Sequence, residues 1–137
     1  MKASDKLKIQ ELLSRAAYYF DERKLEELAG CFTRKASMLV NITGVGEVGP
    51  FDGRDSIMQL MSDTLATQTD VRRHVVSNFF YEAEDKKAAT VVSNLVVTAV
   101  ENGKINVIIS GVYRDDVVRK DGVWRIERRR LDLDLPF

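Results

Sequence analysis

His74 is the only histidine of the chain, and imidazole is the side chain best suited to accept and return a proton near neutral pH. It begins a segment that alternates as a β-strand, so His74, Val76 and Asn78 are expected on one face. If that face lines a cavity, His74 is a candidate general base and Asn78 a candidate substrate-binding residue. The alternative is a structural or solvated histidine, the commoner role of a lone one.

Asp21 is the candidate partner of that imidazole. It ends a predicted helix directly after Phe20, at the edge of the apolar stripe and one turn after Tyr18. A carboxylate beside a histidine fixes the imidazole tautomer and stabilises the imidazolium that forms on proton transfer. The alternative is an exposed acid at a helix end, since aspartate is rarely buried without a partner.

Other kinds of site lack support in the sequence. One histidine, one cysteine and scattered carboxylates give no ligand spacing for zinc or iron, so we expect no metal and no cofactor. Cys31 lies in an apolar segment and is expected to be a small core residue. The glycines between positions 44 and 49 lack the lysine that a phosphate-binding loop requires.

Composition describes an ordinary globular chain of 137 residues, with 45% apolar and 31% charged side chains, which predicts a single domain over residues 1–137. The 21 basic and 21 acidic side chains cancel, so neither nucleic acid nor a membrane surface is an expected partner. The lone cysteine and the lack of an apolar leader favour the cytoplasm.

Three helices are expected in the N-terminal half. Apolar residues recur with helical spacing from 9 to 20, from 25 to 32 and from 57 to 65. A short strand is expected over 38–42, and the glycines that follow it predict a turn region.

Four β-rich runs follow, over 72–84, 87–101, 105–119 and 123–134. The turn pairs Asn102-Gly103 and Asp121-Gly122 separate the last three. Helices followed by a meander predict an α+β fold, with three N-terminal helices packed on a mostly antiparallel sheet. Strands this long must curve, so we expect a cone-shaped α+β barrel around a pocket.

The order and spacing of several short motifs resemble the SnoaL-like family of the nuclear transport factor two-like superfamily. The resemblance covers nearly the whole chain. Its motifs are Tyr18-Tyr19-Phe20-Asp21, Phe51-x-Gly53-Arg54-Asp55-x-Ile57, His74-x-x-x-Asn78, Gly111-x-Tyr113-x-Asp115 and Asp121-Gly122-x-Trp124-Arg125-Ile126-x-x-Arg129, with Leu28-Ala29-x-x-Phe32 and Ala36 after the first.

The resemblance implies catalytic roles for four residues. Two enzymes of that superfamily, scytalone dehydratase and hexachlorocyclohexane dehydrochlorinase, use an aspartate of the first helix and a histidine of the cavity as a catalytic pair. Asp21 and His74 occupy the matching positions in this chain. Tyr18 resembles a cavity tyrosine of these relatives. Arg129 matches an arginine that stabilises a departing anion, although Arg128 and Arg130 have an equal claim from composition.

Four further residues are candidates for substrate binding: Asn78, Trp124, Tyr113 and Phe51. For Trp124 the pattern also favours a core role, because it shares a strand face with Ile126 directly after a turn. Scytalone dehydratase has a second histidine where this chain has Ser93 or Asn94, which speaks against hydration chemistry of its type.

These observations predict a cofactor-independent lyase, hydratase or isomerase acting on a small, largely apolar, aromatic or polycyclic molecule. Two alternatives remain: an assembly protein similar to the β subunit of ring-hydroxylating dioxygenases, and a small-molecule-binding protein. The resemblance also implies a homo-oligomer, a dimer or else a trimer. The apolar residues Val91, Leu95, Val97, Ile109 and Val117 are expected to cover the contact face.

Overall fold

The computed structural model describes residues 1–137 and contains three helices and six strands. The helices are α1 (Ala3–Asp21), α2 (Leu25–Ala29) and α3 (Arg54–Thr67). The strands are β1 (Phe32–Ile42), β2 (Gly46–Asp52), β3 (Val71–Glu84), β4 (Ala88–Glu101), β5 (Lys104–Lys120) and β6 (Val123–Leu133). None of the helices is both long and apolar enough to cross a bilayer.

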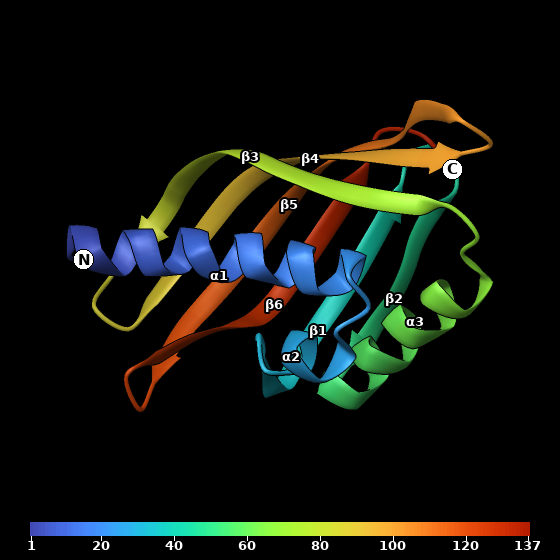
Figure 1. The fold of residues 1–137 in the computed structure, drawn as a ribbon. Helices are drawn as coiled ribbons and strands as arrows, with labels where there is room; N and C mark the ends of the chain where they lie inside the picture. The colour runs from blue at the N-terminus through green and yellow to red at the C-terminus, as the bar shows by residue number, and fades with distance from the viewer.

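All six strands form one sheet in the order β2-β1-β6-β5-β4-β3 (Figure 1). Strands β3 to β6 pair antiparallel with their neighbours in sequence, as the meander prediction requires. Strand β1 joins β6 in parallel and β2 antiparallel, so the sheet is mixed and not closed. The predicted α+β cone is therefore confirmed, with one edge left open between β2 and β3.

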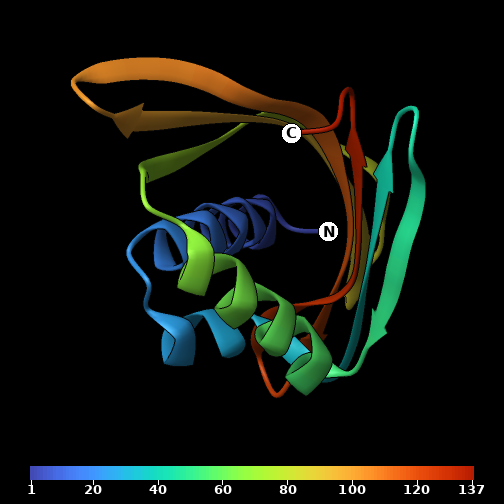
Figure 2. The same cartoon turned by 90° about the vertical axis from the view of Figure 1, so that its right-hand side faces the viewer.

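The long strands curve around α1, which lies in the hollow of the sheet, while α2 and α3 cover its lower side (Figure 2). The apolar face of α1 packs into the core through Ile9, Leu13 and Ala16, which are at most 2% exposed. On the sheet, alternate residues of β4 such as Val91 and Leu95 point inward to meet it. The core thus lies between the concave sheet and the helices, where the periodicities of both elements predict it.

Two local expectations were wrong. The second helix ends at Ala29 and β1 begins at Phe32, because this stretch joins the sheet through the pair Phe32 and Ile126. The glycine-rich region is also not only a turn, since β2 pairs with β1 there as an edge strand. Gly46 and Gly49 hold φ values of +113° and +100°, which side chains rarely tolerate, and this local geometry masked the strand pattern.

Trp124 belongs to the core, as strand alternation predicts. It is 5% exposed, and its indole N–H donates to the carboxylate of Asp5, 3.1 Å away on the first turn of α1. Asp5 also lies 3.7 Å from the guanidinium of Arg119. The contact fastens the start of α1 to the hairpin between β5 and β6.

Trp124→Ala is expected to lower the free energy of unfolding by about 3–5 kcal/mol, because it opens a cavity and leaves Asp5 without its donor. Urea denaturation checks the value. Trp124→Phe keeps the ring in place and should cost less than half as much. Equal stability of wild type and Trp124→Ala would contradict the core role.

Candidate active site

Helix α1 is fixed along strand β3 at both of its ends. Near its start, Lys6 forms a 2.9 Å ion pair with Glu84, and its carbonyl oxygen accepts a 2.6 Å hydrogen bond from the hydroxyl of Tyr81. Just past its end, Glu22 lies 2.7 Å from the guanidinium of Arg73. These contacts set the position of the helix along the strand, and with it the position of any side chain at the helix end.

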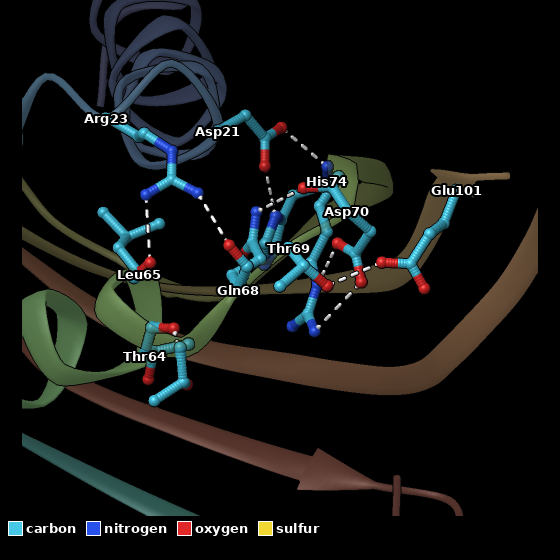
Figure 3. A network of polar contacts seen from close by, with 11 residues as sticks. Asp21, Arg23, Thr64, Leu65, Gln68, Thr69, Asp70, His74 and Glu101 are labelled. Carbon is cyan, nitrogen blue, oxygen red and sulfur yellow. Dashed lines mark hydrogen bonds and ion pairs between the residues drawn. The ribbon is translucent and has the colours of Figure 1, made fainter.

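The predicted pairing of Asp21 and His74 is confirmed (Figure 3). Asp21 is the last residue of α1, and its Oδ1 lies 2.6 Å from Nδ1 of His74. Its Oδ2 accepts a 2.7 Å hydrogen bond from the backbone N–H of the same histidine. The two side chains are 6% and 11% exposed, so water has little access to this contact.

This geometry selects the tautomer of His74. An ionised carboxylate only accepts hydrogen bonds, so the proton of a neutral imidazole must lie on Nδ1. The lone pair is then on Nε2, the nitrogen that Asp21 does not contact. Phe20 packs against the ring at a centroid distance of 5.1 Å and limits its rotation. His74 is thereby held as a proton acceptor in one orientation.

His74 lines a cavity inside the cone with a volume of about 130 Å³. Most of the other lining side chains are apolar and come from the sheet, from α1 and α3 and from the C-terminal residue. They are Phe20, Met38, Val40, Leu60, Met61, Leu95, Ile109, Leu131, Leu133 and Phe137, with Thr64 and Arg72 as further polar members. An apolar cavity with a few convergent polar groups is the usual form of a small-molecule site.

Arg72 lines the same cavity and was not among the residues predicted from the sequence. It precedes His74 by two residues on β3, and strand alternation therefore turns both toward the cavity. The strand alternation that predicts Val76 on the same face as His74 also predicts Arg72 there. Its Nε donates to Asp70 at 2.8 Å, and its Nη2 lies 3.5 Å from the other oxygen of that carboxylate. Arg72 supplies the only positive side chain among those that line the cavity.

Hydrogen bonds from Arg23 and Gln68 fix the segment that precedes β3 (Figure 3). Arg23 donates to the backbone carbonyls of Leu65 and Gln68 at 3.0 and 3.2 Å, which ties the end of α1 to the end of α3. Gln68 in turn donates to the carbonyl oxygen of Asp70. The elements that carry Asp21 and Arg72 are therefore linked to one another as well as to the sheet.

Two sequence candidates lie outside the cavity. Tyr18 is 53% exposed on the outer side of α1, where Lys24 lies over its ring and where it lines a separate, open hollow together with Asp21 and His74. Asn78 lies in a β-bulge between Ser77 and Phe80 and has a φ of +58°. The bulge breaks the alternation that would have placed it beside His74, and its side chain is exposed.

The other substrate-binding candidates are also not among the cavity residues. Trp124 is held by Asp5 at the start of α1, and Phe51 packs from the edge strand β2 against the core. Tyr113 is buried deeper in the cone, and this burial raises the pKa of its hydroxyl. Its ring lies 3.9 Å below the guanidinium carbon of Arg129.

Arg129 faces the interior, whereas Arg128 and Arg130 face outward. A bulge between β5 and β6 shifts the alternation, so that Ile126 and Arg129 both point inward. Arg129 forms a two-pronged salt bridge with Asp115, at 2.7 and 3.1 Å. Burial alone would lower the pKa of Arg129, but the carboxylate outweighs it and raises that pKa, so the cation persists. The structure does not bring Arg129 to the cavity.

Of the two residues that could match the second histidine of scytalone dehydratase, Ser93 points into the cone and Asn94 is exposed. The hydroxyl of Ser93 is buried without a hydrogen-bond partner, opposite Tyr113 on the neighbouring strand. This side of the cone therefore presents no second imidazole to the cavity.

Comparison with known proteins agrees with this architecture. An uncharacterized protein of Mycobacterium tuberculosis, Rv2910c, is 30% identical over 128 residues, which are 92% of this chain and 83% of the relative. A protein of unknown function with a cystatin-like fold from Nostoc punctiforme is 26% identical, with a TM-score of 0.83 over 99% of this chain and 97% of that one.

A third similar protein, from Novosphingobium aromaticivorans, is provisionally named a scytalone dehydratase. It is 23% identical and superimposes with a TM-score of 0.78, over 96% of this chain and 85% of that one, a likeness of fold. The SnoaL-like domain family matches residues 1–130. With that match over nearly all of its length, the chain belongs to the SnoaL-like domain family.

Proposed function

We propose that the protein is a cofactor-independent lyase, hydratase or isomerase that moves protons on a small apolar or aromatic molecule. The observation that carries this proposal is that His74, which lines a largely apolar cavity, is hydrogen-bonded to the buried carboxylate of Asp21. A buried carboxylate that fixes the tautomer of an imidazole is the arrangement that general base catalysis requires.

The size of the cavity favours a substrate with one ring. An apolar protein cavity of about 150 Å³ is known to admit benzene, and the volume here is about 130 Å³. A polycyclic substrate would require Phe137 to move, because this mostly exposed side chain lines the cavity. We therefore expect small aromatic or alicyclic carbonyl compounds to be the first productive ligands.

The proposed mechanism uses three side chains. Nε2 of His74 takes a proton from carbon beside the carbonyl group, and Asp21 stabilises the imidazolium that results. The negative charge that develops on the substrate oxygen is stabilised by Arg72, the role that Arg129 cannot fill while Asp115 holds it. Return of the proton to another atom gives isomerisation, and loss of a β-substituent gives elimination.

Arg72→Gln is expected to lower kcat/KM by about tenfold to a hundredfold, since it removes one charge-assisted hydrogen bond to the developing anion. The loss should be nearer tenfold if the ion pair with Asp70 already neutralises much of the charge of Arg72. Arg114→Gln, which removes an exposed arginine of β5 that does not line the cavity, is the matched control and should stay within about twofold of wild type. Equal rates in Arg72→Gln and wild type would remove Arg72 from the mechanism.

The proposal can be tested without the natural substrate by deuterium exchange. A panel of small cyclic and aromatic ketones is incubated in deuterium oxide with wild type or His74→Gln, and NMR follows the loss of the protons beside the carbonyl. Faster exchange with wild type alone supports the base. Tight binding of panel compounds that is unchanged in His74→Gln, without exchange in either protein, would favour the small-molecule-binding protein instead.

We also propose that the protein forms a homodimer through the outer face of the sheet. The apolar residues first chosen for this face do not cover it, because Val91, Leu95, Val97 and Val117 are buried inside one subunit. Outward positions of β3, β4 and β5 carry other exposed apolar side chains: Val71, Val75, Val100, Ile105 and Val107. Such a patch favours association.

Light scattering should therefore give a mass near twice 15.5 kDa. Val107→Glu places a charge among the exposed apolar side chains of this face and is expected to yield monomers. Val45→Glu, in the exposed turn before β2, is the control and should leave the mass unchanged. A mass near 15.5 kDa for the wild type at every concentration would contradict the dimer.

A further inference from the structure

A second hollow, which we call the basic pocket, lies outside the cone where β1 separates from β6. Its basic residues are Arg34, Lys35, Arg54, Lys120 and Arg125, and its volume is about 540 Å³. None of the residues that line it lines the cavity beside His74. The basic pocket is therefore a separate site.

An irregularity in the sheet opens this pocket. Phe32 of β1 pairs with Ile126, and Ser37 pairs with Arg128, so four residues of β1 stand opposite one residue of β6. The extra residues of β1 bend this strand away from β6, and the gap contains Thr33, Arg34 and Lys35.

The arginines of this pocket differ from most others in the chain because they have no carboxylate partner. Eight arginines elsewhere form ion pairs with acidic side chains: Arg15, Arg72, Arg73, Arg114, Arg119, Arg128, Arg129 and Arg130. Arg34 and Arg54 make no side-chain hydrogen bond. Arg125 uses only its Nε, which donates to the carbonyl of Gly30 at 3.1 Å. Its two terminal amino groups remain free.

The acidic groups nearby leave an excess of positive charge. Glu127 lies 3.6 Å from Lys35 and 3.8 Å from Lys120, and it offsets one of these lysines. Asp121 is the only acidic residue that lines the pocket itself. Five cationic groups thus face two carboxylates, and among the guanidinium groups only the Nε of Arg125 is used by a protein acceptor.

Thr33 provides a second, independent observation. It lines the pocket and is 8% exposed, and its hydroxyl is buried without a hydrogen-bond partner. Buried hydroxyl groups are nearly always hydrogen-bonded, so an unpaired one beside a hollow indicates a place for an outside acceptor.

We propose that the basic pocket binds a small phosphate-bearing molecule. Planar guanidinium groups donate paired hydrogen bonds that match phosphate oxygens, and three of them converging from β1, α3 and β6 suit a multiply charged oxyanion. The hydroxyl of Thr33 would donate to one phosphate oxygen after a small shift. The pocket is larger than one phosphate group, which leaves room for an attached organic part.

Calorimetric titration with pyrophosphate at constant ionic strength tests the proposal. Wild type should give saturable binding with one site per chain. Arg34→Gln and Arg54→Gln should each weaken it by at least about tenfold, the value of a charge-assisted hydrogen bond. Arg15→Gln makes the same change of net charge on α1 and should stay within about twofold, as should His74→Gln.

Three results would overturn the proposal. One is the absence of saturable binding to the wild type, and another is equal weakening by Arg15→Gln, which would indicate an unspecific charge effect. The third is displacement of pyrophosphate by a single-stranded oligonucleotide at far lower concentration, which would assign the surface to nucleic acid.

Discussion

Asp21→Asn is expected to lower the rate of proton exchange by about 10²–10⁴-fold while leaving the fold intact. The amide has the size of the carboxylate, but its N–H can donate to Nδ1 of His74 and so move the ring proton to Nε2. The lone pair would then face away from the cavity, and the base would be lost. His74→Gln should lower the rate at least as much.

The two losses should not add in the double variant, because residues that act as a unit fail together. Glu26→Gln is the matched control, since it removes an exposed carboxylate of α2 that contacts neither His74 nor the arginine that holds the end of α1. Its rate should lie within about threefold of wild type. Additive losses, or a large effect of Glu26→Gln, would show that His74 and Asp21 do not act as a pair.

Arg129→Met is expected to lower the free energy of unfolding by about 3–5 kcal/mol, the cost of leaving a buried charge unpaired. Asp115 is completely buried and its carboxylate has Arg129 as its only ionic partner. Asp115→Asn should destabilise the protein by a similar route, because the Arg129 cation would lose its acceptor. Urea denaturation followed by circular dichroism measures both variants.

Two comparisons sharpen this prediction. Arg130→Met removes a 40% exposed arginine paired with Asp132 and should cost no more than about 1 kcal/mol. The double variant Arg129→Met with Asp115→Leu should recover much of the lost stability, since no charge stays unpaired. Unchanged stability of Arg129→Met together with lost turnover would instead make Arg129 the anion stabiliser.

Periodicity predicted the framework well because long amphipathic elements repeat their signal many times. The stripe of α1 and the strands from β3 to β6 were identified in this way. The pairing of Asp21 with His74 could be predicted only through the family resemblance, since no local pattern relates a helix end to a strand 53 positions later.

The remaining site residues were missed or misplaced where the regular pattern breaks. The bulge at Asn78 and the bulge before Arg129 each change which side chains face inward, and sequence alternation cannot register an inserted residue. Tyr18 does not line the apolar cavity, because it lies on the outer side of α1, where it shares an open hollow with Asp21 and His74. Arg72 follows the simple alternation of β3 through His74, so its place at the cavity was predictable from the sequence.

The central claim, that Asp21 holds the proton of the neutral His74 ring on Nδ1 and leaves the lone pair on Nε2, can be measured directly by ¹⁵N NMR of the imidazole. The chain has one histidine, so the ring signals need no assignment. At a pH where the ring is neutral, the account predicts a protonated Nδ1 and an unprotonated Nε2, with the opposite tautomer in Asp21→Asn. A ring that averages between both tautomers in the wild type, or that is unaffected by Asp21→Asn, would contradict it.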